Sequence, residues 1–304
     1  MGRLIQGEWS THDLGADEKG NFVRRAARFR SVLGSDKHPA EAGRYRLFVA
    51  HACGWSHRTL INRALQGLED AIGVTYVQPF MGEQGWMLED GTPLWKAVYL
   101  KAQADYTGRA SVPVLWDDVA QTIVCNESKD VVTSFDGPMA DLAKHPSPWF
   151  PEDRRDEIQS MIDTNYGPIN DGVYRCGFAA SQEAHEEAAW ALFGRLDEVE
   201  KLLGEQRYLL GDEISAADWY LFPTLYRFDA VYYVHFKCNL RRISEYPNLW
   251  AYTRELYQWP GVRETCRMDE IKEHYYTSHE SVHPRRYIPI GPILDFDEPH
   301  GRGR

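Results

Sequence analysis

The sequence predicts an α/β domain followed by an all-helical domain. Over residues 45–137, short apolar runs typical of strands alternate with segments whose apolar residues recur at helical spacing. Beyond residue 151 the periodicity is helical. A length of 304 residues is enough for two domains of ordinary size.

Residues 1–43 are polar and irregular, and we expect them to form an N-terminal extension. Phe22, Ala26 and Phe29 lie at helical spacing within residues 21–33 of this extension. We expect a few aromatic side chains of this kind to anchor the extension on the body of the protein.

The α/β domain is expected to span residues 44–137. An insertion spans residues 80–106. After it, two apolar runs lie on either side of Asp117-Asp118, and we expect them to form a β-hairpin. The predicted elements are a strand over 45–50, a helix over 57–68, a strand over 74–77, hairpin strands over 112–116 and 122–125, and a helix over 127–137. A strand–helix–strand unit pairs its strands in parallel through a right-handed crossover. A strand–strand–helix tail after such a unit is the thioredoxin-like arrangement.

Residues 138–151 contain four prolines and are expected to form an interdomain linker. Residues 152–304 are then expected to form the helical domain with a C-terminal tail. Its longest predicted helix spans 181–203. Another begins at Ser215, where Asp218 replaces the usual Glu of a capping box.

Cys53 follows the first predicted strand and stands at the start of the first predicted helix. A helix macrodipole places roughly half a positive elementary charge there, which favours the reactive thiolate. The competing interpretation is that Cys53 is a buried, inert small hydrophobe. Because Ser56 occupies the place of a second cysteine, no internal disulfide can form at this turn. A single thiol must exchange with an external one through a mixed disulfide, which indicates a small-thiol partner.

Composition and charge limit the partners and the location. The net charge of −11 argues against nucleic acid and against an anionic membrane surface. Neither a signal peptide nor an apolar run approaching the ~18 residues of a membrane span is visible. The five cysteines are odd in number and lack metal-ligand spacing, so we expect a cytoplasmic protein without a bound metal. Structural roles are expected for Cys125, Cys176, Cys238 and Cys266.

Many short motifs together resemble one family over almost the whole chain. They are Phe29-Arg30, 41–45, 53–61, Gly85-Trp86, Gly108-Arg109, 112–117, 126–128, 169–174, 274–276 and 288–292. The chain resembles the glutathionyl-hydroquinone reductases, which are Xi-class, omega-like glutathione transferases. This resemblance implies the glutathione transferase fold, a homodimer formed through the helical half, and glutathione as co-substrate without a metal.

The resemblance also implies a thiol-binding site. Val112 and Pro113 would be joined by a cis peptide bond, and the backbone of Val112 would bind the cysteinyl part of glutathione. The alternative for Pro113 is a trans proline that enters an edge strand. Glu127 and Ser128 would hold the γ-glutamyl end, since free amides at a helix start bind a carboxylate and Glu127 can pair with the ammonium. The alternative for Glu127 and Ser128 is helix capping alone.

Two further residues have open roles. Trp86 is expected to line one side of the thiol site. The competing interpretation is that it packs in the hydrophobic core. Arg109 either contacts a carboxylate of the thiol or is structural. His57 follows Cys53 by one helical turn, and we expect it to lie on the helix surface or to have a packing role, because the helix dipole already suffices to ionise the thiol.

The implied activity is reduction of a glutathione thioether on a quinol ring. The Cys53 thiolate attacks the glutathione sulfur, the hydroquinone leaves, and a second thiol releases the resulting mixed disulfide. Hydroxyl donors near the ring oxygens would help the ring leave. The resemblance assigns this role to Tyr166, Tyr174 and Tyr275 or Tyr276, against a packing role for each.

One motif departs from the family pattern. The family usually has Cys-Pro-Trp-Ala at the active turn, whereas this chain has Cys53-Gly54-Trp55-Ser56. Glycine there leaves more room and restores a backbone donor, so we expect glutathione or a related small thiol as co-substrate. The alternative is neutral drift at a tolerant position. Two other functions stay open: an omega-like thioltransferase or dehydroascorbate-type reductase, and a non-catalytic carrier of aromatic ligands. Classical conjugation is disfavoured, because it normally uses Ser or Tyr.

Overall fold

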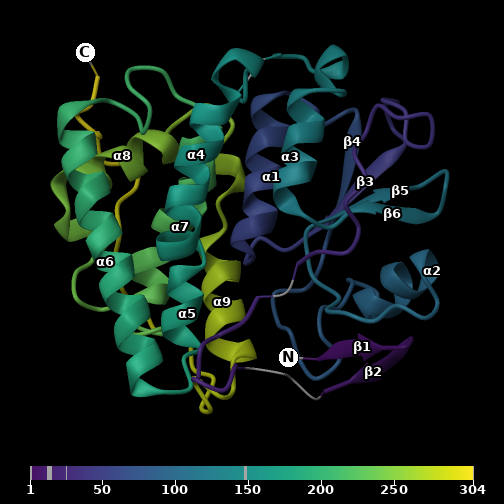
Figure 1. Cartoon of the computed structure of the whole chain (residues 1–304), viewed down its shortest axis with the longest axis horizontal. Helices are drawn as coiled ribbons and strands as arrows, with labels where there is room; N and C mark the ends of the chain where they lie inside the picture. Colours follow the sequence, from purple (N-terminus) through teal and green to yellow (C-terminus); the bar gives the residue numbers. More distant parts are fainter. Residues whose placement is uncertain (1, 12–15, 25, 147–148, 304) are drawn as a thin grey trace. The chain divides into compact units, whose positions relative to one another are not determined.

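The computed structural model describes residues 2–11, 16–24, 26–146 and 149–303 (Figure 1). The chain divides into two compact units. The first comprises Met1–Leu14, Arg25–Pro148 and Thr265–Ser278; the second comprises Gly15–Arg24, Trp149–Glu264 and His279–Arg304. The units are therefore interleaved along the sequence, whereas the sequence analysis expected a linear division. Parts of the expected extension (residues 1, 12–15 and 25) and linker (147–148) lie outside the described residues.

The first unit is built on a four-stranded mixed sheet with the order β4-β3-β5-β6. Strands β3 and β4 are parallel, and β5 is antiparallel to both of its neighbours. The elements are β3 (Tyr45–Val49), α1 (Gly54–Leu65), β4 (Ile72–Tyr76), β5 (Val114–Asp117), β6 (Thr122–Cys125) and α3 (Ser128–Asp136). Helices α1 and α3 pack side by side (Figure 1). This order confirms the predicted thioredoxin-like arrangement.

Helix α1 starts at Gly54 with Cys53 as its N-cap, which confirms the expectation that a helix begins at this cysteine, although the apolar periodicity covered only 57–68. Its last residue is Leu65 rather than Leu68. The helix stops because Gly67 adopts a left-handed conformation with φ +64°, where a Cβ would lie 2.8 Å from the Lys144 side chain. Only glycine takes up that conformation without strain.

The N-terminal extension forms more structure than expected. Strands β1 (Arg3–Ile5) and β2 (Glu8–Ser10) make a small antiparallel hairpin. Leu4 and Gly108 exchange backbone hydrogen bonds of 2.8 and 3.0 Å, which fix this hairpin on the first unit. The ring of Trp9 stacks on that of Trp95 at 5.4 Å.

The helical spacing of Phe22 and Phe29 was misleading, because the described residues within 21–33 form no helix. Phe22 packs on Phe178 of the second unit, with ring centroids 5.5 Å apart. Phe29 stacks on Tyr106 of the first unit, also at 5.5 Å. The two rings are anchors, as expected, but for different units.

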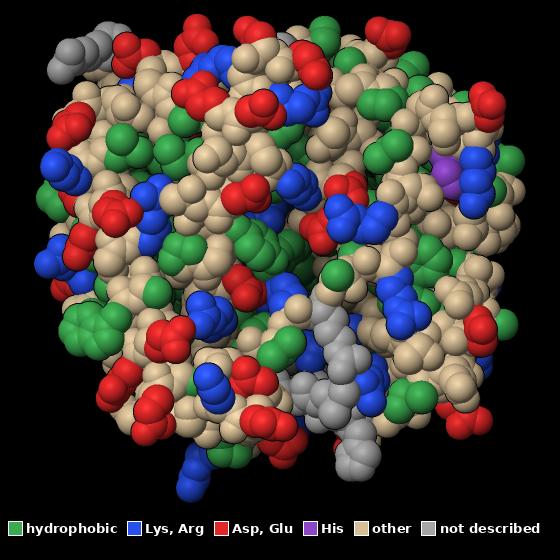
Figure 2. Space-filling view, viewed as in Figure 1, with side chains coloured by type: hydrophobic (Ala, Val, Ile, Leu, Met, Phe, Trp, Pro, Cys, Tyr) green, Lys and Arg blue, Asp and Glu red, His purple; other side chains and the backbone are tan. Residues whose placement is uncertain are grey.

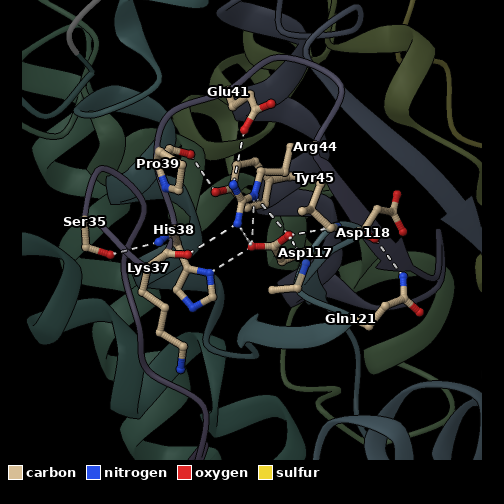
Figure 3. Close-up of polar contacts among 12 residues, drawn as sticks. Ser35, Lys37, His38, Pro39, Glu41, Arg44, Tyr45, Asp117, Asp118 and Gln121 are labelled. Atoms are coloured by element: carbon tan, nitrogen blue, oxygen red, sulfur yellow. Dashed lines mark hydrogen bonds and ion pairs between the residues drawn. The ribbon is translucent and has the colours of Figure 1, made fainter.

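A buried ionic cluster joins residues 35–45 to the end of β5 (Figure 3). Asp117 accepts from Arg44 Nη2 at 2.9 Å and lies 3.0 Å from His38 Nδ1. Burial alone would raise the pKa of Asp117, but Arg44 and three further hydrogen-bond donors outweigh it and lower this pKa to about 2. Since Asp117 pairs with Tyr45, the cluster lies at the opposite end of β3 from Cys53.

The second unit is helical. Its α-helices are α4 (Arg155–Asn165), α5 (Gly172–Gly177), α6 (Gln182–Glu205), α7 (Ala216–Arg227) and α8 (Pro247–Tyr257). Helix α7 is buried along its whole length, and both α4 and α8 pack on it. The capping box is confirmed, with Asp218 accepting the Ser215 N–H at 2.9 Å. A π-helical turn, Tyr166–Asn170, leads from α4 into α5.

One further helix, α9 (Met268–Ser278), belongs to the first unit although it lies late in the sequence. The insertion of the first unit holds a π-helical turn (Trp95–Tyr99) and the short helix α2 (Leu100–Ala102). On the face drawn in Figure 2, acidic and basic side chains are interspersed rather than gathered by sign. That face therefore offers no extended basic surface to a polyanion.

Candidate active site

Cys53 is the N-cap of α1 and is half-buried. Its sulfur accepts a hydrogen bond from the Ser56 N–H at 3.4 Å and donates to the Val112 carbonyl, also at 3.4 Å. The side chain of Ser56 accepts from the Ala50 N–H at 3.4 Å, which ties the turn back to the end of β3. The sulfur therefore lies at the positive end of the helix dipole.

An apolar wall adjoins this turn. Cys53 packs against a cluster of buried side chains that includes Ala52, Trp86 and Val112. The peptide bond between Val112 and Pro113 is cis, as predicted. The first unit thus places the thiol, Trp86 and the cis-proline loop in one cluster.

The β6–α3 corner holds the residues expected to bind the γ-glutamyl end. Glu127 is the N-cap of α3, and its Oε1 accepts from the Lys129 N–H at 3.4 Å and from the Ser128 hydroxyl at 3.5 Å. Asn126 exchanges hydrogen bonds with the Phe29 backbone at 3.0 and 3.1 Å. Capping contacts are therefore present at this corner, while the recognition role of Glu127 and Ser128 stays a prediction.

Tyr99 is a residue that the sequence analysis missed. It is fully buried, and its hydroxyl donates to the Ser111 carbonyl at 2.7 Å and accepts from the Ser111 N–H at 3.1 Å. The Asn126 Nδ2 lies 3.3 Å from the same oxygen. One phenol thus joins the loop before Val112 to the corner before Glu127. No local signal marks it, because a buried tyrosine in an insertion resembles ordinary core.

Trp86 and α9 are linked through His274. The two rings stack with centroids 4.6 Å apart and 18° between their planes. His274 Nδ1 donates to the Pro79 carbonyl at 2.8 Å, and the Ser278 hydroxyl accepts from the Met81 N–H at 2.9 Å. These contacts hold α9 on the loop that carries Trp86, within the unit that contains Cys53.

Tyr275 and Tyr276 follow His274 on α9, and each is 2% exposed. The Tyr275 ring meets the His274 ring edge to face at 5.3 Å. Burial raises the pKa of Tyr276 to about 12, so its hydroxyl stays protonated at neutral pH and can donate a hydrogen bond. The late helix α9 therefore brings two of the predicted tyrosines into the first unit.

Tyr166 and Tyr174 lie in the second unit. Tyr166 begins the π-helical turn, and Tyr174 lies on α5. The Tyr174 hydroxyl is 3.5 Å from that of Tyr232, and its ring packs against Phe236 at 5.5 Å. Tyr174 is half-buried in an aromatic cluster of this unit.

The two remaining candidates have mainly internal contacts. The carbonyl of Arg109 accepts from the Tyr106 hydroxyl at 3.3 Å, and the residue is half-buried. His57 is buried, and its Nε2 lies 2.9 Å from the Thr265 hydroxyl and 3.7 Å from the Cys266 sulfur. These contacts join the first turn of α1 to the segment before α9.

Two features do not occur in the part of the chain that the structure describes. No group of three or more His, Cys, Asp and Glu side chains there could hold a metal ion. Within the described ranges, no helix has the length and the apolar character needed to cross a membrane.

Comparison with known proteins identifies relatives of nearly full length. Residues 182–255 match the glutathione S-transferase C-terminal domain. The chain is 43% identical to glutathionyl-hydroquinone reductase YqjG of Escherichia coli K12, over 99% of this chain and 98% of that protein. A solved structure of YqjG with glutathione bound matches with a TM-score of 0.90 and 40% identity over 99% of both chains. A Xi-class glutathione transferase from Natrialba magadii matches with a TM-score of 0.92 and 42% identity, over 99% of this chain and 97% of that one. The chain therefore belongs to the glutathionyl-hydroquinone reductase family of Xi-class glutathione transferases, and it is an enzyme of the glutathione transferase fold.

Proposed function

We propose that this enzyme reduces glutathionyl-hydroquinones through a mixed disulfide on Cys53. The observation that carries the proposal is the half-buried sulfur at the start of α1, beside the Ser56 N–H and the Val112 carbonyl. A thiolate is the nucleophile in thiol–disulfide chemistry, and a helix start stabilises it. The family relatives named above support the substrate class.

The reaction is balanced by a second thiol. The Cys53 thiolate attacks the sulfur of the thioether, the sulfur–ring bond breaks, and its electron pair passes to the ring. The ring takes up a proton and leaves as hydroquinone, while Cys53 keeps glutathione as a mixed disulfide. A second glutathione thiolate then attacks that disulfide, which releases glutathione disulfide and restores the Cys53 thiolate.

An aryl carbon is a poor leaving group unless the ring first becomes a ketone tautomer. Breaking the sulfur–ring bond then yields an enolate, whose oxygen is stabilised by hydrogen-bond donors. We assign this role to Tyr174 and to Tyr275 or Tyr276, with Tyr166 as a further contact. The Tyr276 hydroxyl, whose pKa burial raises to about 12, is protonated at neutral pH and therefore has a hydrogen to donate.

The thiol is proposed to bind at the edge formed by the cis-proline loop and the start of α3. The backbone of Val112, followed by Pro113, would pair with the cysteinyl part, while Glu127 and Ser128 would hold the γ-glutamyl end. Trp86 would wall the sulfur, and Arg109 would contact a carboxylate. Glutathione is the thiol that the glutathione-bound structure of YqjG supports.

The test uses the glutathione thioether of 1,4-benzenediol with glutathione as reductant. We expect hydroquinone and glutathione disulfide to form in equal amounts, and intact mass to show one glutathione on Cys53 when the second thiol is withheld. Turnover of simple mixed disulfides without turnover of the thioether would instead indicate an omega-like thioltransferase. Adduct formation from related thiol disulfides, measured in competition, would show which small thiol Cys53 prefers.

Two properties complete the proposal. We propose that the enzyme is a homodimer, as the resemblance implied, and cytoplasmic, as the odd number of cysteines without metal-ligand spacing indicated. Light scattering at micromolar concentration should give twice the mass of the chain. A monomer at that concentration would contradict the dimer without affecting the chemistry at Cys53.

A further inference from the structure

Residues 16–24 form a short segment anchored on the second unit. The Asp17 carboxylate folds the segment back on itself by accepting from the Lys19 N–H at 2.9 Å. The carbonyl of Gly20 accepts from the Ala180 N–H at 2.9 Å, and the Ser181 hydroxyl donates to the Lys19 carbonyl at 2.9 Å. Gly20 has φ +87°, and a Cβ there would lie 2.8 Å from Ser181. The segment therefore lies tightly against the start of α6.

The end of this segment places Arg24 beside Tyr174. Arg24 Nε lies 2.6 Å from Asp171 Oδ1, and the guanidinium carbon lies 5.0 Å from the centre of the Tyr174 ring. The same carbon lies 5.4 Å from the centre of the Phe22 ring. Asp171 directly precedes α5, the helix that carries Tyr174. One cation thus contacts an aspartate and a tyrosine that are three residues apart.

The arrangement keeps the guanidinium charged and oriented. The Arg24 side chain is 31% exposed and that of Asp171 is 14% exposed, so water screens the pair only in part. Burial alone would lower the pKa of Arg24, but Asp171 and the phenols of Tyr166 and Tyr174 outweigh burial and raise it. A guanidinium can bind a carboxylate through its edge while its face covers an aromatic ring.

A cation beside a phenol has a direct consequence for hydrogen bonding. When the phenol donates to an oxygen that gains negative charge, its own oxygen gains negative charge as well. A nearby positive charge stabilises that change, more strongly where water is partly excluded. The same cation restrains the ring, because leaving its face would cost the cation–π contact.

We propose that Arg24 is a positioning residue for thioether reduction, which holds the Tyr174 ring and strengthens its hydroxyl as a donor to the ring oxygen of the departing hydroquinone. This inference rests on the proposed function, in which Tyr174 contacts the quinol. Arg24 itself makes no bond to the substrate in this account. In this account, the role of residues 16–24 is to place the Arg24 guanidinium beside Tyr174.

The test compares Arg24→Gln, Tyr174→Phe and the double variant in the full-length enzyme. Two substrates are used: the glutathione thioether of 1,4-benzenediol, and the mixed disulfide of glutathione with 2-hydroxyethanethiol, whose sulfur leaving group needs no donor. We expect Arg24→Gln to lower kcat on the thioether about tenfold and on the mixed disulfide less than twofold. Because Arg24 acts through Tyr174, the double variant should be no slower than Tyr174→Phe alone.

Arg175→Gln is the matched control, because Arg175 lies on α5 next to Tyr174 but pairs with Glu187 of α6 at 3.2 Å. It should leave both activities unchanged. If Arg24→Gln does not fold, Arg24→Met retains the apolar stem against Phe22 and is assayed in its place.

Three outcomes would overturn the inference while leaving the proposed function intact. In the first, Arg24→Gln has the wild-type kcat on the thioether. In the second, it lowers kcat on both substrates equally. In the third, the double variant is slower than Tyr174→Phe alone by the full factor that Arg24→Gln causes by itself. A different result would show that the proposed function itself is at fault. In that case Tyr174→Phe would leave thioether reduction unchanged, or the wild type would not turn the thioether over at all.

Discussion

Two strand–turn–helix corners of the first unit each hold a cysteine, and the two cysteines have opposite environments. Cys53 lies between β3 and α1, and its sulfur accepts from the Ser56 N–H at 3.4 Å. Cys125 ends β6 before α3, and its sulfur accepts from the Glu127 N–H at 3.3 Å. Cys53 is itself the N-cap and half-buried, whereas Cys125 is 0% exposed and burial raises its pKa to about 12. Because both sulfurs accept a backbone hydrogen bond, we expect position at the helix start and access, rather than that bond, to decide which thiol reacts.

The two helix starts also present different chemistry. The N-cap of α1 is a thiol, which can act as a nucleophile, and the N-cap of α3 is the Glu127 carboxylate, which can bind a cation. Tyr99 joins Asn126, before the second start, to Ser111, and the next residue, Val112, accepts from the Cys53 sulfur. We therefore expect substitutions at the first corner to affect the chemical step and substitutions at the second to affect thiol binding.

The largest effect is expected at the first corner. Cys53→Ser should lower kcat for thioether reduction by about 10³-fold or more, because a hydroxyl is a far weaker nucleophile toward sulfur. The thermal unfolding midpoint should stay within a few degrees. Cys125→Ala is the matched control and should keep kcat within about twofold. Turnover of the thioether by Cys53→Ser would contradict a mechanism in which Cys53 is the nucleophile.

The alkylation rates of Cys53 and Cys125 should differ by a factor similar to the expected loss of kcat in Cys53→Ser. With a pKa of about 12, only about 10⁻⁴ of Cys125 is thiolate at pH 8, and its burial blocks the reagent as well. We expect iodoacetamide to modify Cys53 about 10³-fold faster than Cys125 in the native protein. Peptide mass mapping over time measures both rates. Equal alkylation rates of the two cysteines in the native protein would contradict the expected difference in their environments. Equal rates after denaturation would not, because unfolding exposes both thiols.

At the second corner, Glu127→Gln should raise KM for glutathione about tenfold and leave kcat within about twofold, since a charged pair to the γ-glutamyl ammonium is lost. Asp130→Asn is the control, because Asp130 also lies in the first turn of α3 but pairs with Arg30. It should leave KM unchanged. An unchanged KM in Glu127→Gln, together with a lower unfolding midpoint, would restore the capping interpretation.

The connection between the corners should give a smaller effect. Tyr99→Phe removes the hydroxyl that bonds Ser111 and Asn126, so the free energy of unfolding should fall by about 1–2 kcal/mol. KM for glutathione should rise about threefold, because both binding segments lose their common support. Tyr106→Phe, whose hydroxyl bonds the Arg109 carbonyl, is the control for a neighbouring ring. A Tyr99→Phe enzyme that loses stability but keeps its KM would limit Tyr99 to packing.

The smallest effect on the reaction is expected from Asp117, at the far end of β3. Its pKa falls from 3.8 to about 2 on folding, so its stabilising contribution is present above pH 4. That contribution, about 2 kcal/mol, is lost as the pH falls toward 2. Asp117→Asn should remove this pH dependence in denaturant titrations and should leave Cys53 alkylation unchanged. Slower alkylation would show that the cluster also supports the first corner.

Local patterns account for the elements that surround the candidate site. Apolar runs predicted β3, β5 and β6, helical periodicity predicted α1 and α6, and Glu127 and Gly137 marked the ends of α3. The capping box at Ser215 was also predicted. Each of these depends on residues close in sequence, which is why sequence reasoning reaches them. The cis bond before Pro113, by contrast, was expected only from the resemblance to the family.

Contacts between distant residues decided the rest. The β1–β2 hairpin depends on pairing with Gly108, and Phe22 and Phe29 pack against rings of different units, so their helical spacing carried no information about a helix. His274 joins α9 to Trp86 over 188 residues of sequence (274 − 86), and Arg24 reaches Tyr174 over 150 (174 − 24). The sequence by itself determined where a reactive thiol could stand, because the dipole of a helix start is local. Only the tertiary structure decided which side chains surround it, because side-chain packing and hydrogen bonding over long sequence separations leave no periodic signal.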